Sequence, residues 1–392
     1  MSLKLSYPTQ STTALLPVCQ SARAATHSLR VLQIGKYYPP YRGGMETHLH
    51  ALCERLKEEM HVEVLVANDG KRTCEEVVDE IKVTRVATLT KIASAPFCPG
   101  MVTKIRQSNA DIVHIHLPNP TAVLAFMASG HQGRLVFTYH SDIVKQRYLS
   151  YVFDPVLRAS LNKAHAIIAS TENYMMTSET LSRVLNRCHV IPFGIRVEDF
   201  HEPNHAEVAR LRARYGERMV LGVGRLVYYK GFEYLVRAMA KIDAHLVIVG
   251  KGPLHAHLLQ IAGELGIGDR VSILDEVEDV SAYYHAASVF ALPSIARSEA
   301  FGLVQLEAMA CGKPVVNTDL DSGVKYVSLD KVTGLTVPPA DATAMADAIN
   351  LLLDNPQQAA LYGQVGKQRV AEHFSLEVMT QRTIELYRQV MR

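Results

Sequence analysis

Two glutamates, Glu299 and Glu307, flank the predicted start of one helix. They lie in the segment PSIARSEAFGLVQLEAMACGKPVV, residues 293 to 316, where the helical stretch LVQLEAMA follows a strand and a glycine. Both carboxylates can face a ligand over the helix N-terminus, where the free amides of Phe301, Gly302 and Leu303 would meet a phosphate. The carboxylates would accept hydrogen bonds from hydroxyls of a sugar and of a ribose. Alternatively, one of the two glutamates caps the helix and the other is an ordinary surface residue.

A basic pair, Arg225 and Lys230, stands beside a glycine-rich turn. The pair belongs to the segment GVGRLVYYKG, residues 222 to 231, which follows a predicted strand and leads into a helix. Glycines let the backbone approach a phosphate, while the guanidinium and the ammonium supply donors and charge for a diphosphate. A dinucleotide site fits less well, because the third glycine of G-x-G-x-x-G is missing. The alternative for the basic pair is a solvated loop.

The elements that must hold these residues alternate between short apolar runs and amphipathic stretches. Helices are predicted over residues 44–59, 155–163, 172–185 and 375–390, with Pro155 at the first position of the second one. The apolar runs begin at residues 31, 62, 112, 135, 166 and 189, and then at 219, 245, 271, 289, 314 and 335. This βαβ rhythm predicts an α/β fold with two parallel sheets. Ligands bind at the carboxyl ends of such strands, so a cleft between two domains is the expected site.

The length of 392 residues is enough for two domains with a core each. Residues 1–27 contain no acidic residue and are rich in Ser, Thr and Ala, which predicts a disordered tail, with an organellar transit peptide as the alternative. The polar segment EDFHEPNHA, residues 198 to 206, predicts a linker. The domains are therefore expected over residues 28–200 and 201–374, followed by a C-terminal helix over 375–392 that can pack back on the first domain.

The composition is that of a globular protein, with 48% hydrophobic and 20% charged residues. No apolar run is long enough to cross a membrane, which takes about 18 residues. Residues 1–200 carry 22 Lys and Arg against 17 Asp and Glu. That excess is too small for a nucleic-acid partner but suits an anionic or membrane-surface acceptor. The 6 cysteines form no C-x-x-C pair, so a zinc knuckle or a disulfide framework is not indicated.

Taken together, these segments resemble the family 4 glycosyltransferases of the GT-B fold, whose signature is two glutamates separated by seven residues. The resemblance extends from about residue 30 over nearly the whole chain, through KYYPPYRGGMETHLHAL, FTYHSD, VIPFGIRVEDF, GVGRLVYYKG, VIVGKGP and TGLTVPP. It implies two Rossmann-like parallel-sheet domains that face each other across a cleft, the first on the acceptor side and the second binding a nucleotide sugar. It also implies a retaining enzyme. The scattered cysteines indicate a reducing compartment, so a cytoplasmic enzyme is expected.

The resemblance assigns roles to the residues on the donor side. Arg225 and Lys230 hold the donor diphosphate together with the helix N-terminus, Glu299 contacts the transferred sugar, and Glu307 holds the ribose. The diphosphate is then neutralised without a metal. No cofactor is expected, since the nucleotide sugar is a substrate.

On the opposite side, the resemblance places Gly43 and Gly44, in the loop after the first strand, against the donor phosphates or sugar. His140, at the end of the strand LVFTY, matches the family's active-site histidine near the reacting carbon. Without the resemblance, a satisfied histidine at a strand end is the alternative. His114 and His116 alternate along one strand and are predicted to be packing residues rather than metal ligands.

Two departures from the family pattern concern the donor. The strand that begins at residue 271 reads SILDEVED, without the glycine that many relatives have beside the base pocket, and this leaves the base open. The stretch NTDLDSGVKYVS lacks the commoner glycine pair and acid and is more similar to relatives that build bacterial polysaccharide from mannose or rhamnose donors. This favours a GDP-sugar over a UDP-sugar. Asp319 and Asp321 form a D-x-D that follows a strand. We interpret it as part of a turn rather than as a metal site.

The acceptor is expected to be a glycan or a lipid-linked molecule. Segment 91 to 107 carries Lys91, Lys104 and Arg106 without an acid, and Phe97 and Met101 could dip into a bilayer surface. Peripheral attachment to the inner face of the membrane and an ordinary surface are both compatible with this pattern.

Two other functions fit parts of the sequence. A GT-B nucleotide-sugar epimerase or sugar-phosphate synthase would share the fold and the diphosphate site, but it would turn over the donor alone or with a small sugar phosphate. A non-catalytic nucleotide-sugar-binding protein would bind the donor without releasing nucleotide. The carboxylates, the basic pair and His140 together favour the transferase.

Overall fold

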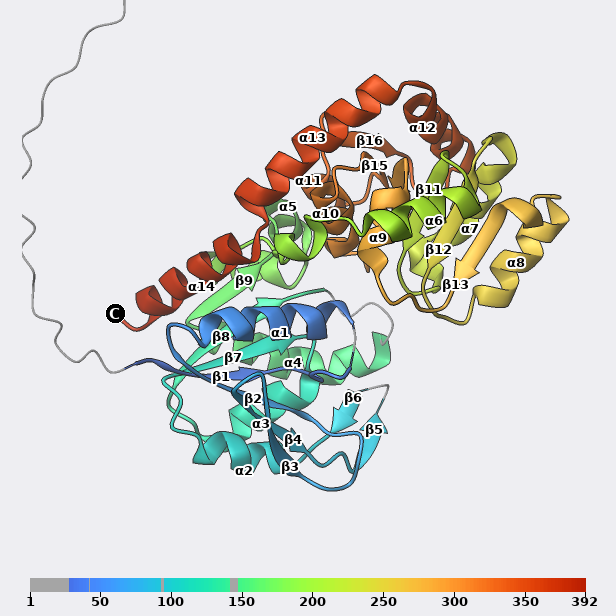
Figure 1. Cartoon of the computed structure of the whole chain (residues 1–392). Coiled ribbons are helices and arrows are strands. Elements are labelled where there is room, and N and C mark those ends of the chain that lie inside the picture. Colours follow the sequence, from blue (N-terminus) through green and yellow to red (C-terminus); the bar gives the residue numbers. More distant parts are fainter. Residues whose placement is uncertain (1–27, 42, 93–94, 142–146) are drawn as a thin grey trace, which may run out of the picture.

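The computed structural model describes residues 28–41, 43–92, 95–141 and 147–392. The tail predicted over residues 1–27 lies outside the described residues. Two α/β domains lie next to each other, and the last helix returns over the first domain (Figure 1). The predicted α/β fold with two parallel-sheet domains is therefore confirmed.

The first domain is built on a large sheet. Its strands and those of a small hairpin are β1 (Arg30–Ile34), β2 (His61–Ala67), β3 (Cys74–Val78), β4 (Ile81–Val86), β5 (Thr90–Ile92), β6 (Ala95–Phe97), β7 (Ile112–Leu117), β8 (Arg134–Tyr139), β9 (Ala166–Ala169) and β10 (Cys188–Val190). Eight of them form one sheet in the order β10-β9-β8-β7-β1-β2-β4-β3. Only β3 pairs antiparallel to its neighbour, and β5 and β6 form a separate antiparallel hairpin.

Helices cover both faces of this sheet. They are α1 (Gly44–Leu56), α2 (Gly100–Gln107), α3 (Pro120–Ser129), α4 (Arg147–Lys163), α5 (Glu172–Thr177), η1 (Leu181–Arg183), η2 (Leu185–Arg187) and η3 (Val197–Phe200). The buried side chains of α1 pack on one face, and those of α2, α3 and α4 pack on the other. Because both faces are covered, central strands such as β7 are buried along their whole length.

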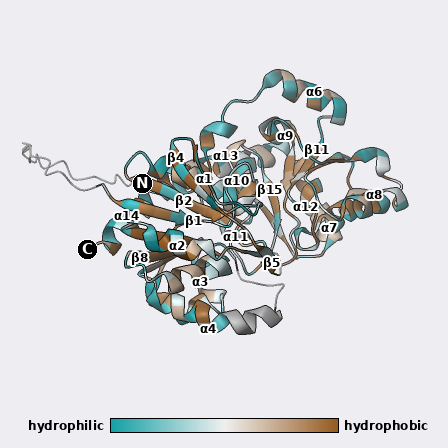
Figure 2. Ribbon diagram, turned by 90° about the horizontal axis from the view of Figure 1, so that it is seen from below, coloured by the Kyte–Doolittle hydropathy of each residue, from teal (hydrophilic) through white to brown (hydrophobic). Residues whose placement is uncertain are grey.

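The second domain contains a smaller, fully parallel sheet. Its strands are β11 (Met219–Val223), β12 (His245–Val249), β13 (Val271–Leu274), β14 (Val289–Ala291), β15 (Val315–Thr318) and β16 (Gly334–Val337). They lie in the order β13-β12-β11-β14-β15-β16. Hydropathy colouring shows apolar strands inside and helices that are polar on their outer faces (Figure 2).

The helices of the second domain again form two layers. They are α6 (His205–Tyr215), η4 (Tyr228–Lys230), α7 (Phe232–Ala238), η5 (Met239–Lys241), α8 (His255–Glu264), η6 (Gly268–Arg270), α9 (Val280–Ala286), α10 (Leu303–Ala310), α11 (Val324–Val327), α12 (Ala342–Asp354) and α13 (Pro356–His373). The last helix, α14 (Leu376–Val390), packs on the first domain. Side chains of α6, α9 and α10 pack on one face, and those of α7, α8 and α12 pack on the other. No helix in the described part of the chain has both the length and the apolar character needed to cross a membrane.

The chain passes between the domains twice, and the two crossings pair with each other. The amide of Ile195 donates to the carbonyl of Phe374 over 2.9 Å, and the amide of Leu376 donates back to the carbonyl of Ile195 over 2.8 Å. Beyond this crossing, α14 packs against α1 in the core of the first domain (Figure 1). The domains are further joined by Ala300, which comes from the second domain and is buried in the core of the first.

Some local predictions were wrong in extent. Pro155 lies inside α4, which begins at residue 147, and not at its first position. The helix predicted over 172–185 is α-helical only over α5 and continues as two short 3-10 turns. The predicted linker over 198–206 includes most of η3 and the first residues of α6.

The strand order changes direction at one point in each sheet, and these points locate the site. In the first sheet, β1 stands between β7 and β2, and in the second, β11 stands between β14 and β12. Connections leave such neighbouring strands on opposite sides, which opens a crevice at their carboxyl ends. Gly43 and His140 lie in the loops after β1 and β8, and Gly44 begins α1. Arg225 and Glu299 lie in the loops after β11 and β14, and Lys230 ends the short turn η4.

Candidate functional site

The basic pair lies at the carboxyl end of β11. Arg225 is exposed, and its Nη2 donates to the hydroxyl of Tyr229 over 3.0 Å. Lys230 is buried, and its Nζ would lie 3.3 Å from a Cβ built on Gly224. The missing side chain of Gly224 therefore leaves the space in which the lysine is held. The two cations differ in freedom, since Lys230 is fixed within the turn and Arg225 stands at the surface.

Lys230 and Glu299 form a buried ion pair. The distance from Lys230 Nζ to Glu299 Oε2 is 2.6 Å, and the two side chains are 11% and 9% exposed. The hydroxyl of Ser294 donates to the same carboxylate oxygen over 3.0 Å. Ions in a buried pair need compensation for the water that they lose. A ligand that offers phosphate oxygens to the lysine and hydroxyls to the carboxylate can take the place of each partner.

Glu307 is held by a residue that the sequence analysis did not single out. The hydroxyl of Tyr284, on α9, donates to Glu307 Oε2 over 2.6 Å. Burial raises the pKa of Glu307, while the bond from Tyr284 and the positive charge of Lys230 oppose that increase. Since Glu307 senses the charge of Lys230, the structure brings Lys230, Glu299 and Glu307 into one electrostatic group.

The first turns of two helices face each other between the domains. α10 follows Gly302, which has φ 77° and supplies no capping side chain, and α1 follows Gly43, which supplies none either. A Cβ built on Gly44 would lie 4.0 Å from Leu303 Cδ1, so the two helix starts are in near contact. Unpaired amides and the positive ends of two helix dipoles meet here. This arrangement suits a bound anion such as a diphosphate.

Lys36 adds a cation from the first domain that the sequence analysis missed. Burial lowers the pKa of Lys36, Glu46 raises it, and the positive charges of Lys91 and Arg225 lower it further. The effect of Arg225 means that cations of the two domains stand close to each other. Its position in the sequence could have indicated it, because Lys36 follows β1 directly, in the same motif as the two glycines.

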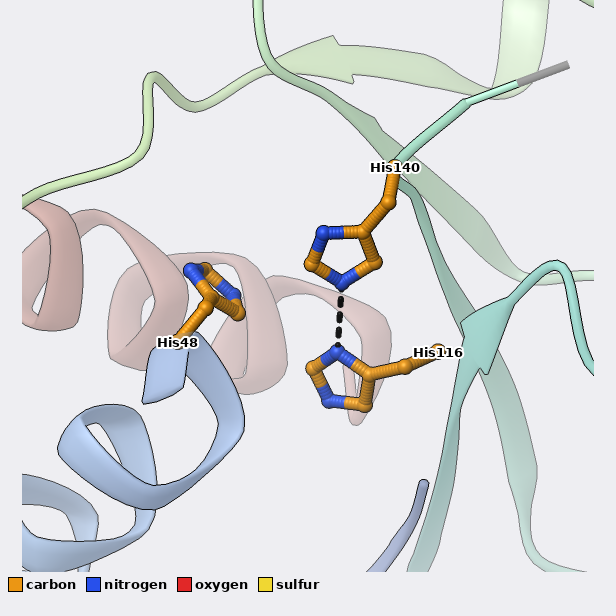
Figure 3. Close-up of side chains that lie close together, drawn as sticks. All are labelled: His48, His116 and His140. Atoms are coloured by element: carbon orange, nitrogen blue, oxygen red, sulfur yellow. Dashed lines mark hydrogen bonds between the residues drawn. The ribbon is translucent and has the colours of Figure 1, made fainter. Parts of the chain in front are cut away.

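His140 is held on three sides at the end of β8. Its Nε2 lies 3.0 Å from Nδ1 of His116 (Figure 3). One face stacks on Phe193 with 4.9 Å between ring centroids, and the ring of His48 meets it edge-on at 4.9 Å. Burial holds the pKa of His140 and of His116 well below the usual range, so both rings are neutral at pH 7. Phe193 also contacts Phe301 at 5.2 Å, which connects His140 with the start of α10.

The histidine cluster has the composition of a metal site. Ring nitrogens of His48, His116 and His140, one from each residue, lie within 4.8 Å of one another, and such a group could hold an ion. His116 and His140 already use one nitrogen each in their mutual hydrogen bond.

The D-x-D pair lies away from this cluster. Lys325 Nζ lies 2.7 Å from Asp319 and 4.0 Å from Asp321, and all three side chains are well exposed. The ammonium stands where a metal bridging the two carboxylates would need to be.

Two descriptions of known families match the chain, one for each half. "Glycosyltransferase Family 4" matches residues 42–199, and "Glycosyl transferases group 1" matches residues 205–369. The chain is 31% identical to O-antigen chain mannosyltransferase C of Escherichia coli over 365 residues, covering 92% of this chain and 98% of that protein. It is 33% identical to the D-rhamnosyltransferase WbpZ of Pseudomonas aeruginosa over 355 residues, covering 88% of this chain and 92% of that protein.

A solved structure has the same arrangement of domains. Sucrose-phosphate synthase from Thermosynechococcus elongatus superposes with a TM-score of 0.77 at 26% sequence identity. The superposition covers 92% of this chain and 99% of the synthase. The two-domain architecture is thus shared over most of the chain.

Proposed function

Because the chain belongs to glycosyltransferase family 4, has the GT-B fold and is a hexosyltransferase, we propose that it transfers mannose or rhamnose from a GDP-sugar to a glycan or lipid-linked acceptor with retention of configuration. The observation that carries the proposal is the buried pair of Lys230 and Glu299, 2.6 Å apart, beside the uncapped start of α10. Two of the relatives to which the chain is similar are a mannosyltransferase and a rhamnosyltransferase. This supports a place in polysaccharide biosynthesis.

In the proposed mechanism, the diphosphate of the donor takes over Lys230 and the amides at the start of α10. Glu299, released from the lysine, accepts hydrogen bonds from the sugar, and Glu307 accepts them from the ribose. Positive groups aimed at the departing diphosphate stabilise the charge that develops as the glycosidic bond breaks. Gly44 and His140 close the site from the first domain.

Retention is proposed from the family to which the chain belongs, and the positions of the carboxylates bear on how it is achieved. Glu299 and Glu307 both lie on the side of the diphosphate site, and each already accepts a hydrogen bond from a neighbouring side chain. Neither is placed as a nucleophile opposite the leaving group, so the acceptor hydroxyl attacks from the face that the diphosphate leaves, with a leaving oxygen as base. NMR of the product checks this, because an inverted anomeric configuration would contradict it.

No metal or cofactor is needed in this mechanism. Lys230, Arg225 and two helix starts supply the positive charge that a metal provides in other transferases. Turnover in excess EDTA should equal turnover in buffer with added magnesium. A loss of activity in EDTA that zinc restores would instead favour an ion in the histidine cluster.

The preference for guanine rests on acids at the carboxyl end of β13. Asp275, Glu276 and Glu278 follow this strand, and Lys251 Nζ lies 2.7 Å from Glu276. Guanine presents an amino group that can donate hydrogen bonds to a carboxylate. Thermal shifts with GDP-, UDP- and ADP-sugars test the choice, since a ligand stabilises the folded state according to its occupancy. A larger shift with UDP-sugars would contradict the preference.

The acceptor side includes an exposed apolar hairpin. Leu89, Ile92 and Phe97, on or beside β5 and β6, are 57%, 49% and 42% exposed. Lys91 of the same hairpin is close enough to Lys36 to lower its pKa, so the hairpin borders the site. Exposed apolar side chains with a nearby cation suit a membrane surface that carries a lipid-linked acceptor.

The rest of the predicted membrane segment does not take part. Met101 is 1% exposed and belongs to the core, so the expectation that it reaches the bilayer was wrong. Lys104 lies 2.7 Å from Glu75, and Arg106 donates to the carbonyl of Ser129. The proposed contact is therefore the hairpin alone.

Flotation with anionic liposomes tests this contact. Phe97→Ser and Ile92→Ser should reduce the floated fraction. Leu361→Ser is the matched control, because Leu361 is 53% exposed on α13 in the second domain. Equal flotation of all variants, or no flotation of the wild type at low salt, would contradict attachment through the hairpin.

An assay of nucleotide release distinguishes a transferase from the other two candidate functions. Release that requires a glycan acceptor supports the proposal. Release with donor alone, or only with a sugar phosphate, would point to an epimerase or a synthase. Binding without release would identify a nucleotide-sugar-binding protein.

A further inference from the structure

A line of buried hydrogen bonds connects His140 with the last helix. Nε2 of Gln33, on β1, donates to the hydroxyl of Tyr387, on α14, over 2.9 Å. Oε1 of Gln33 lies 3.0 Å from Nε2 of His116, and Nδ1 of His116 lies 3.0 Å from Nε2 of His140. Gln33 and Tyr387 are 0% exposed and His116 is 1% exposed. Buried polar groups must find partners within the protein, so each bond constrains the next.

The line continues on the far side of Tyr387. The hydroxyl of Tyr387 lies 2.5 Å from Nδ1 of His114, and Nε2 of His114 lies 2.7 Å from the hydroxyl of Thr138. Both His114 and Thr138 are buried. Tyr387 therefore receives the hydrogen of the Gln33 amide and has its own hydrogen available for His114.

The amide of Gln33 sets the direction of every bond. Its oxygen can only accept, so Nε2 of His116 carries the hydrogen. His116 is neutral, because burial holds its pKa well below the usual range, and its Nδ1 therefore has a lone pair. Nε2 of His140 must then carry a hydrogen in order to donate to His116. His140 is neutral too, which leaves its Nδ1 as an acceptor.

The ring of His140 is also fixed in orientation. Phe193 stacks on one face at an interplanar angle of 29°, and His48 meets the ring edge-on at 83°. Nδ1 of His140 makes no hydrogen bond to the described residues, and His140 is 7% exposed. One ring nitrogen is thus bound to His116 and the other is left for a ligand.

We propose that Gln33, His116 and Tyr387 are positioning residues that fix His140 as the tautomer with its hydrogen on Nε2, so that Nδ1 accepts a hydrogen bond from a hydroxyl of the donor sugar. The alternative arrangement would reverse the amide of Gln33 and every bond along the line, and would turn Nδ1 of His140 into a donor. In the first arrangement the hydroxyl of Tyr387 accepts from the amide nitrogen and donates to His114. The role at the sugar rests on the proposed function, whereas the tautomer does not.

The tautomer can be measured in ligand-free protein with selectively 15N-labelled histidine. A protonated ring nitrogen and a bare one differ in 15N chemical shift, and His140→Phe assigns the signals. We expect a protonated Nε2 and a bare Nδ1 in the wild type. Gln33→Met removes the acceptor for His116, so the Nδ1-protonated form of His140 should gain population. Tyr387→Phe, which is nearly isosteric, should shift it in the same direction.

Kinetics test the link to the sugar. With saturating donor, Gln33→Met should lower kcat about 10-fold, as expected for the loss of one hydrogen bond of about 1.4 kcal/mol. A panel of monodeoxy donors identifies the hydroxyl concerned, because its removal slows the wild type but has no further effect in Gln33→Met or in His140→Phe. Thr383→Val is the control, since Thr383 is a buried hydroxyl on the same helix that donates to Met379 within the helix.

The outcomes separate the two parts of the proposal. A hydrogen on Nδ1 of His140 in the wild type, or an unchanged tautomer in both Gln33→Met and Tyr387→Phe, would overturn the positioning role. A shifted tautomer without any change in the response to deoxy donors would overturn the contact with the sugar. A change of equal size in Thr383→Val would reduce the effect to general destabilisation of α14 and would also overturn the proposal.

Discussion

At the scale of single residues, the site is defined by charged side chains that are paired with each other. Lys230 and Glu299 are both nearly buried, and the carboxylate is also bonded to Ser294. Removing one partner of such a pair leaves the other uncompensated. The pair therefore keeps both ionised groups in place.

Lys230→Ala and Glu299→Gln should each lower kcat by about 10²-fold or more at saturating donor, because each removes a charge that acts on the departing diphosphate or on the sugar. Arg237→Ala is the control, as its pair with Glu233 on α7 is exposed. Initial rates of nucleotide release measure the effect. Turnover near that of the wild type in either variant would refute these assignments.

Glu307 makes the stability of the ligand-free protein depend on pH. Burial raises its pKa above the ordinary value of 4.5, so the folded state holds this proton more tightly than the unfolded state. Stability that is present below pH 4.5 is then lost as the pH rises through the raised pKa. Glu307→Gln should melt at the same temperature as the wild type near pH 4 and at a higher one at pH 7, although it binds nucleotide less tightly. Thermal unfolding of both proteins between pH 4 and pH 7 tests this. An equal shift in melting temperature at both ends of the range would contradict the prediction.

At the scale of elements, the start of α10 depends on a backbone conformation that favours glycine. Gly302 has φ 77°, and an added Cβ would lie 2.9 Å from Leu292 Cδ2 and 2.8 Å from Gln305 Nε2. Gly312, at the other end of the same helix, has φ 68° but nothing within 4 Å of an added Cβ. The two glycines therefore separate the cost of the dihedral angle from the cost of displacing the helix start.

Gly302→Ala and Gly312→Ala should both lose about 1–2 kcal/mol of stability from the left-handed conformation. Only Gly302→Ala should also lose more than 10-fold in affinity for the nucleotide, because its methyl group moves the amides that face the diphosphate. Calorimetric titration with GDP and thermal unfolding of both variants provide the comparison. Equal affinities would mean that these amides do not hold the nucleotide.

The sequence predicted the strands better than it predicted the hydrogen-bond partners of the site residues. All the apolar runs that it marked are strands, because parallel strands buried on both faces are short and continuously apolar. Four strands between residues 74 and 97 were missed. β3, CEEVV, is an exposed edge strand without an apolar run, charged residues interrupt β4, IKVTRV, and β5 and β6 have three residues each. Among side chains, the motifs indicated Glu307 but not Tyr284, and His140 but not Gln33 or Tyr387. The bond between Gln33 and Tyr387 joins residues 354 positions apart, and no local pattern records it.

At the scale of the whole molecule, the two domains are related through the paired crossings of the chain. Gly194 lies at the first crossing, and a Cβ built on it would lie 2.4 Å from the carbonyl oxygen of Ser375 in the second. Two residues later the chain forms the ion pair of Arg196 with Glu54 on α1. The neighbouring Phe193 lies between His140 and Phe301, so a shift at this crossing moves the two halves of the site against each other.

Gly194→Ala should therefore reduce both stability and activity, because the methyl group meets backbone that cannot rotate away. Overpacking of this kind typically costs about 1–3 kcal/mol. Gly263→Ala is the matched control, since Gly263 lies on α8 with nothing within 4 Å of an added Cβ, and alanine in a helix should stabilise it slightly. Because the donor groups lie within the second domain, Gly194→Ala should lower kcat more than it weakens GDP binding. Parallel measurements of kcat and of GDP affinity decide the matter, and a loss confined to affinity would mean that the crossing does not set the alignment of the two halves.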